Sequence, residues 1–156
     1  MPSRDKEFWA FMVAKLNMKE EKRKEAITKI VRKGLLMRLV LECDFLDARL
    51  AAMEKLDTYD IRKTTGEEYA FYLKLAMNEK VAEIRRIASN RLDPADRNKL
   101  TGSPFADMRL TVAQITSSRD TLIRLLVDPD EQVRATAEKS LKKKNLREDI
   151  DPRSIN

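Results

Sequence analysis

The chain has 156 residues, enough for one domain, and its 32 Lys and Arg exceed its 26 Asp and Glu to give a net charge of +6 at pH 7. It contains no histidine and one cysteine, Cys43, which excludes an internal disulfide, a Cys/His metal site and a nucleophile activated by histidine. No apolar run reaches the length of a membrane span and the lone cysteine fits a reducing compartment, so we expect a cytoplasmic protein without a cofactor.

The first helix is predicted over residues 4–16, which carry one broad apolar side. That side is formed by Phe8, Phe11, Met12, Ala14 and Leu16, with Trp9 close by. We expect this helix to close the exposed end of a helical array, because a terminal element has no neighbour to bury its outer face. The alternative is an amphipathic anchor for a membrane or a partner.

A second helix is predicted from Met18 to Lys33. Asn17 and Glu20 would form a capping box at its start, and Gly34 would occupy its stop position. Shorter helices follow, because apolar periodicity alternates with cap residues and prolines. They are predicted over residues 35–43, 45–56, 66–77, 81–91, 95–101, 105–116, 118–127 and 131–144. The expected caps are Asp44, Thr65 with Glu68, Asp93, Ser103, either Ser117 or Ser118, and Asp130.

An arginine followed three or four residues later by alanine recurs in these helices. The arginines, called anchor arginines below, are Arg49, Arg85, Arg109 and Arg134, and they are separated by 36, 24 and 25 residues. Such a period indicates stacked repeats that bury their apolar faces against one another. The alanines, expected where neighbouring helices approach closely, are Ala52, Ala88, Ala113 and Ala137. Cys43 is expected to be a small core residue.

The segments DARLAAMEKL and DPDEQVRATAEKSL resemble HEAT-like helical repeats, and the shorter spacings resemble the leucine-rich-repeat-variant subclass. The resemblance implies an all-α fold, a short right-handed α-solenoid of about four HEAT-like helix pairs over residues 35–144. A two-helix cap would precede it at residues 1–34, and a polar tail predicted to fray would follow at residues 145–156. The alternative is a non-repetitive helical bundle in which the matches arise by chance.

The anchor arginines have two interpretations. Each guanidinium could pair with a turn carboxylate such as Asp44 or Asp130, which resembles the Asp–Arg ladder of HEAT-type repeats. A row of arginines could instead bind phosphate or carboxylate groups of a ligand. Repetition close to a turn favours the structural role, so we interpret all four as structural repeat residues.

Two basic clusters are the candidate binding residues. Between Lys15 and Arg38, nine Lys and Arg accompany three glutamates, so this segment alone carries +6. The candidate contacts with an acidic partner or nucleic acid are Lys22, Arg23, Lys29, Arg32, Lys33, Lys142, Lys143 and Lys144. A solvated surface with i, i+4 Glu–Lys pairs is the alternative, and no aromatic side chain is interleaved for base stacking.

The sequence therefore favours a non-catalytic scaffold or adaptor that binds another protein on the solenoid surface, on a concave side formed by the second helix of each pair. No residue is assigned a catalytic, cofactor-binding or metal-binding role. The alternative function is nucleic-acid binding, or binding of another polyanion, by the Lys15 to Arg38 segment. The sequence does not fix the oligomeric state.

Overall fold

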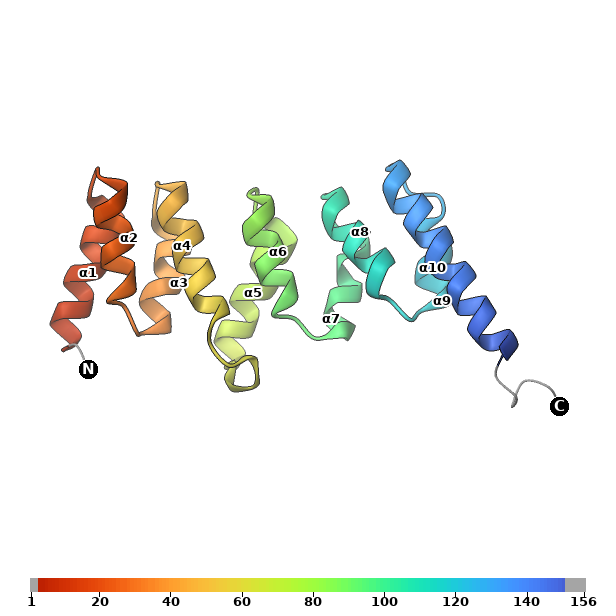
Figure 1. Ribbon diagram of the computed structural model, residues 1–156, viewed down its shortest axis with the longest axis horizontal. Coiled ribbons are helices and arrows are strands. Elements are labelled where there is room, and N and C mark those ends of the chain that lie inside the picture. Colours follow the sequence, from red (N-terminus) through yellow and green to blue (C-terminus); the bar gives the residue numbers. More distant parts are fainter. Residues whose placement is uncertain (1–2, 151–156) are drawn as a thin grey trace. The chain divides into compact units, whose positions relative to one another are not determined.

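The computed structural model describes residues 3–150, with side chains up to residue 145. These residues form ten α-helices and two short 3-10 helices, and none of them lies in a β-strand (Figure 1). The predicted all-α fold class is confirmed. The chain divides into two compact units, Met1–Phe71 and Tyr72–Asn156, each described here by itself.

The first unit contains two helix pairs in contact. Its elements are α1 (Arg4–Leu16), α2 (Glu20–Thr28), α3 (Lys33–Glu42), α4 (Leu46–Asp57), η1 (Ile61–Lys63) and the first turns of α5 (Gly66–Asn78). Helix α1 packs against α2 and α3, and α4 packs against α3 and α2. The largest fully buried side chains of this core are Phe11, Ile30, Leu36, Leu39, Met53 and Leu56.

The second unit is centred on α8. Besides the end of α5, its elements are α6 (Ala82–Asn90), α7 (Pro94–Asn98), η2 (Lys99–Gly102), α8 (Ala106–Ile115), α9 (Arg119–Leu125) and α10 (Glu131–Ile150). Helix α8 contacts α6, α7, α9 and α10, and α9 packs on α10. The largest fully buried side chains here are Tyr72, Ile84, Ile87, Leu92, Leu100 and Met108.

The small side chains predicted at close helix approaches are buried. All four predicted alanines are fully inaccessible to solvent, namely Ala52, Ala88, Ala113 and Ala137. Cys43 is also buried, with its Sγ 3.9 Å from the carbonyl oxygen of Ala14, so its predicted core position is confirmed. A methyl group lets two helix axes come close together, and a longer side chain at these sites would have to displace its neighbours.

Most of the caps predicted from neighbouring residues are present. The amide of Glu68 donates to Thr65 Oγ1 at 3.2 Å, and the amide of Thr65 donates to Glu68 Oε2 at 3.4 Å, which completes a capping box at the start of α5. Asp93 accepts from the amide of Asp96 at 2.9 Å to begin α7. The other predicted caps are taken in turn below.

Between the two serines left open by the sequence, Ser118 begins α9: its Oγ accepts from the amide of Thr121 at 3.2 Å. We expect Ser118→Ala to lower the free energy of unfolding by about 1 kcal/mol, the usual cost of losing an N-cap oxygen. Ser117→Ala is the matched control, because Ser117 is exposed and its backbone carbonyl, which the substitution keeps, is the group that accepts from Lys144. Urea denaturation followed by circular dichroism measures both, and equal losses would contradict the assignment.

The second helix is shorter than predicted. It ends at Thr28 rather than Lys33, because Lys55 Nζ donates to the carbonyl oxygens of Ile27 and Thr28, at 2.9 Å each. The Tyr59 hydroxyl donates to the carbonyl oxygen of Val31, three residues beyond the end of α2, at 2.6 Å. Both donors come from beyond residue 50, so a local pattern could not place this helix end.

The predicted stop and start signals of this region are wrong. Gly34 lies in the first turn of α3, and no described glycine has a positive φ. Helix α2 begins at Glu20, so Asn17 and Glu20 form no capping box; Asn17 Oδ1 instead accepts from the amide of Lys19 at 2.9 Å.

Two other caps are also wrong. The N-cap positions of α4 and α8 are held by Phe45 and Phe105 rather than by Asp44 and Ser103. Asp130 does cap α10, since it accepts from the amide of Val133 at 3.1 Å. That helix continues to Ile150, beyond the predicted end at residue 144, and residues 151–156 lie outside the described part of the chain.

Candidate functional site

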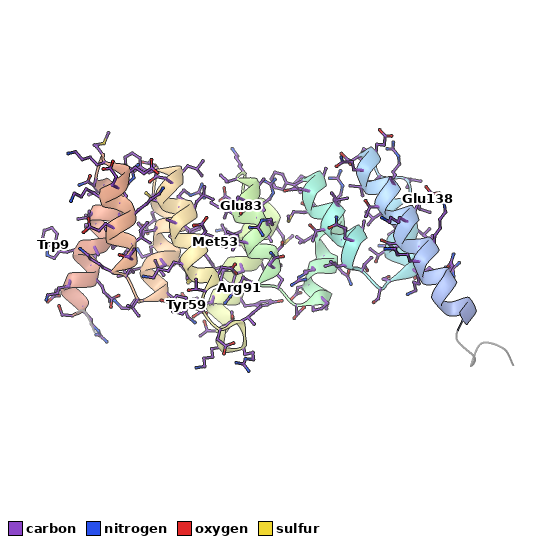
Figure 2. The ribbon with its side chains drawn as sticks, viewed as in Figure 1. Trp9, Met53, Tyr59, Glu83, Arg91 and Glu138 are labelled. Atoms are coloured by element: carbon purple, nitrogen blue, oxygen red, sulfur yellow. The ribbon has the colours of Figure 1, made fainter. Side chains whose placement is uncertain are left out.

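The outer side of α1 is an exposed apolar strip. Trp9 is 71% exposed and Leu16 is 59% exposed, and Val13 lies between them on the same side of the helix. Met12 borders the strip and is half-buried. Positions i, i+4 and i+7 share one helix face, so these side chains form a strip about two turns long. Figure 2 shows the Trp9 side chain projecting from α1 away from the other helices of its unit.

The opposite side of α1 packs inward. Phe11 and Ala14 are buried, and so is Glu7, whose carboxylate accepts from the backbone amides of Val31 and Arg32 at 3.2 and 3.0 Å. These hydrogen bonds, that of Arg32 above all, lower the pKa of Glu7. Helix α1 thus covers α2 and α3, as expected of a closing helix, but part of its own apolar surface stays exposed on the outer side.

Two hollows of about 330 Å³ each flank the strip. The first, called the α1–α2 groove below, is lined from α1 by Lys6, Trp9, Ala10 and Val13 and from the α2 segment by Lys22, Glu25, Ala26 and Lys29. The second is lined by Trp9, Met12, Val13, Leu16 and Asn17. Trp9 and Val13 border both hollows, so they form a ridge between them. Buried alanines, Ala10 and Ala26, form the floor of the groove.

The rim of the α1–α2 groove is basic. Lys22 and Lys29 share a single carboxylate, Glu25, with Nζ–Oε distances of 3.7 and 3.5 Å. Lys6 adds a third exposed cation from α1. Three lysines and one glutamate leave a charge of +2 around an apolar floor.

The basic segment as a whole is largely neutralised by carboxylates. Eight of its nine cations form ion pairs, namely Lys15, Lys22, Arg23, Lys24, Lys29, Arg32, Lys33 and Arg38. Four of the partners come from outside the segment: Glu7, Glu42, Asp47 and Glu68. Adding these four to the three glutamates within it leaves nine cations against seven carboxylates, a charge of +2 instead of +6.

Arg23, predicted as a surface contact, is a buried structural residue instead. It is 5% exposed, and its Nε and Nη2 donate to the Asp47 carboxylate at 3.0 and 2.8 Å. Its Nη1 donates to the carbonyl oxygen of Asn17 at 2.8 Å, and its guanidinium lies 4.0 Å from the centre of the Phe45 ring. The hydrogen bonds with Asp47 raise the pKa of Arg23 and lower that of Asp47.

The other predicted contacts of the first cluster divide into two groups. Lys33 is half-buried against Glu68, at 3.1 Å, and Arg32 Nη2 donates to the carbonyl oxygen of Arg4 at 2.9 Å, so both hold the fold together. Lys22 and Lys29 are exposed at the groove. The structure therefore retains these two lysines as candidate ligand contacts.

The second cluster, on α10, belongs to the other unit. Lys142 pairs with Glu138 at 2.9 Å, and Lys143 is exposed. Lys144 Nζ donates to the carbonyl oxygen of Ser117 and so ties α10 to the segment before α9. These contacts match the solvated-surface interpretation of the cluster.

Glu42 accepts hydrogen bonds from Arg38 and Lys15, which lower its pKa from 4.5 to about 2. Because the folded-state value is lowered, the ionised carboxylate stabilises the fold above about pH 4.5 and this contribution disappears as the pH falls towards 2. We expect the urea midpoint of Glu42→Gln to fall less steeply over this range than that of the unmodified chain. Glu54→Gln, at an exposed site on α4, is the control and should leave the slope unchanged.

Two of the three anchor arginines in the second unit, Arg85 and Arg109, form ion pairs as predicted, but with other carboxylates. Arg85 Nη2 donates to Asp107 at 2.9 Å, and Arg109 binds Asp128 through Nε and Nη2 at 2.8 and 3.1 Å. Asp130, the expected partner, is the cap of α10. Arg134 Nη1 donates to the carbonyl oxygens at residues 128 and 129, and Arg49 Nε donates to the carbonyl oxygen of Val40 at 2.7 Å. Asp44 is exposed.

One constellation of three residues occurs in both units. Arg85 lies 3.8 Å from the Phe105 ring centre and pairs with Asp107, as Arg23 does with Phe45 and Asp47. In each case the aromatic residue is the N-cap and the aspartate is the second residue of a helix in the next pair. The arginine thus ties the turn before its own helix to the start of the following second helix.

Three further features of the described residues concern metal ligands, a charged hollow and helix length. No group of three or more Cys, Asp or Glu side chains among them is placed to hold a metal ion. A hollow of about 520 Å³ between α3 and the start of α5 is lined by Lys33, Arg38, Glu67 and Glu68, whose charges balance. Within residues 3–150, no helix has both the length and the apolar character needed to cross a membrane.

Comparison of the chain with protein-family models, with curated proteins and with solved structures found no match in any of the three. A function therefore has to be inferred from the geometry of the chain itself. The exposed apolar strip on α1 and the basic groove beside it are the features best suited to bind a ligand.

Proposed function

We propose that the chain is a non-catalytic protein-binding module that docks its partner on the outer side of α1. The observation that carries the proposal is the row of Trp9, Val13 and Leu16, unburied and flanked by two hollows. An exposed aromatic–aliphatic cluster beside a concavity is typical of interaction sites, and Trp is prominent among residues that dominate binding energy. A scaffold that binds through a helix face needs no catalytic residue and no cofactor.

We also propose that the helix pairs are HEAT-like repeats in a short right-handed α-solenoid, with α1 and α2 as a repeat of the same kind. Arg23 supports this extension, because it precedes Arg49 by 26 residues and is followed three residues later by Ala26. The Arg–Phe–Asp arrangement found in both units supports the repeat interpretation independently, since a helical bundle without repeats is not expected to contain the same three-residue arrangement twice. A repeat at the end of a stack keeps one uncovered face, which is what α1 offers a partner.

The docking surface proposed here differs from the concave side that the sequence favoured, because the exposed apolar row of Trp9, Val13 and Leu16, which two hollows flank, lies on α1. Nucleic-acid binding by the Lys15 to Arg38 segment is the weaker alternative, since carboxylates reduce the charge of the segment to +2. A phosphate backbone also gains nothing from an apolar strip. We expect no salt-sensitive binding of duplex or single-stranded DNA or RNA at about 0.15 M salt.

The test places a photo-crosslinking amino acid at Val13 and, as the matched control, at the exposed Glu54 of α4 in the same unit. We expect a protein from native cells to crosslink at position 13 and not at position 54. The purified partner should then bind the Trp9→Ala variant about tenfold more weakly or worse. Equal crosslinking at both positions, or unchanged affinity of Trp9→Ala, would overturn the proposed function.

A further inference from the structure

We propose that the α1–α2 groove accepts an amphipathic helix with acidic residues on both sides of its apolar face. The inference rests on the proposed function and adds the chemical class of the partner. It follows from three properties of the groove: a floor of two alanines, a wall formed by Trp9 and Val13, and lysines along the rim.

The shape of the groove fits a helix. Ala10 and Ala26 are buried at its floor, so a third helix could approach closely between α1 and α2. The other side of this pair is already covered by two helices, α3 and α4. From Lys6 to Val13 the α1 wall of the groove spans about 10 Å, which matches about two turns of a partner helix with apolar anchors at i, i+3 or i+4, and i+7.

The charge of the groove selects the partner. Lys6, Lys22 and Lys29 surround the apolar floor with only Glu25 to offset them, so acidic side chains beside the partner's apolar face would meet cations. A second copy of this chain is disfavoured, because a two-fold contact through this face would oppose +2 with +2. An anionic membrane would also attract lysines beside a tryptophan, but a flat surface cannot fill the hollows on both sides of the ridge.

The experiment uses Trp9 as the reporter, because it is the only tryptophan of the chain and is largely exposed. The full chain is titrated with three tryptophan-free amphipathic peptides of about 15 residues that share one Leu face and carry Glu, Gln or Lys on its flanks. We expect the Glu peptide to shift Trp9 emission to shorter wavelength and to bind about tenfold more tightly than the Lys peptide at low salt. Added salt should reduce the difference in affinity between the Glu peptide and the Lys peptide, because it screens the charges.

Matched variants locate the charge effect. Lys22→Gln with Lys29→Gln should remove the preference for the Glu peptide, whereas Lys19→Gln with Lys24→Gln removes the same charge from exposed sites outside the groove lining and should preserve it. Circular dichroism confirms that both double variants keep their helix content. Loss of the preference in both variants would assign it to net charge and overturn the groove as its source.

The remaining outcomes separate the two proposals. Equal binding of all three peptides with an emission shift would overturn the acidic partner but leave helix docking on α1, and with it the proposed function. An emission shift with anionic phosphatidylserine vesicles and with none of the peptides would assign the strip to a membrane surface. No shift with any peptide would overturn the inference, while crosslinking at Val13 would still decide the proposed function.

Discussion

An Asp128→Ala variant is expected to lose about 3 kcal/mol of unfolding free energy, because Asp128 is a buried carboxylate that accepts several hydrogen bonds. It is buried, accepts two hydrogen bonds from Arg109 at 2.8 and 3.1 Å, and accepts a third from the amide of Asp130 at 2.9 Å. The hydrogen bonds with Arg109 lower the pKa of Asp128, so the carboxylate is ionised at neutral pH. Truncation would leave a half-buried guanidinium and a backbone amide without their acceptor.

The loss is measured by urea denaturation at pH 7, followed by circular dichroism. Asp120→Ala is the control: it removes an exposed aspartate from the first turn of α9, where the favourable interaction with the helix dipole is worth about 0.5 kcal/mol. The double variant Asp128→Ala with Arg109→Met tests the ion pair itself. We expect it to be more stable than the sum of the single losses implies, since neither buried charge then stands alone. Strictly additive losses would contradict a coupled pair.

Features that depend on residues within one turn could be predicted from the sequence. The capping box at Thr65 and the caps at Asp93 and Asp130 are formed by atoms three positions apart, so the chemistry of the local sequence is sufficient. The buried alanines were also predicted, because their spacing follows the period of the anchor arginines. The caps depend on interactions within one helical turn, and the alanine positions follow a sequence pattern that recurs along the chain.

Features set by distant residues were missed. Helix α2 ends early because Lys55, 27 residues further along the chain, binds its last carbonyl groups. Arg23 lies in a lysine-rich stretch, so its charge suggested a surface contact, although its partner Asp47 lies 24 residues downstream. A signal was available: Arg23 and Ala26 repeat the anchor pattern.

Two of the failed caps, those predicted at Asp44 and Ser103, have the same origin. Phe45 and Phe105 occupy the N-cap positions, where an aromatic side chain has no capping oxygen, because each ring receives an arginine from the preceding pair. A cation over an aromatic face, joined to a paired carboxylate two residues on, offsets the missing cap hydrogen bond. The pattern Phe-x-Asp, 22 residues after Arg23 and 20 residues after Arg85, would have identified both sites.

The exposed strip on α1 could be anticipated only as an apolar helix face. Its division into a buried half and an open half depends on which residues α2 and α3 cover, and this is fixed by packing. The groove likewise exists only because Lys22 and Lys29 of the α2 segment lie beside Trp9 of α1. The turn between the two helices brings these residues together, and the amino-acid composition does not show it.

The close approach of helices at the recurring alanines leads to the second large effect, an expected loss of about 2 kcal/mol for Ala137→Leu. Ala137 is fully buried in α10, which packs against α8 and α9, so three added carbon atoms must displace neighbouring side chains or separate the helices. Ala135→Leu is the matched control in the same helix: it is exposed, and leucine forms helices nearly as well as alanine, so its effect should stay within about 0.5 kcal/mol.

Both variants are compared by urea denaturation, and Ala88→Leu in α6 repeats the measurement at an equally buried alanine of the same unit. If the alanines are sites of close helix approach, Ala137→Leu and Ala88→Leu lose similar stability while Ala135→Leu does not. A small loss at both buried sites would mean that the helices can separate to admit a leucine. The period of small residues would then be a by-product of helix-forming composition, and the repeat interpretation would rest on the arginine constellation alone.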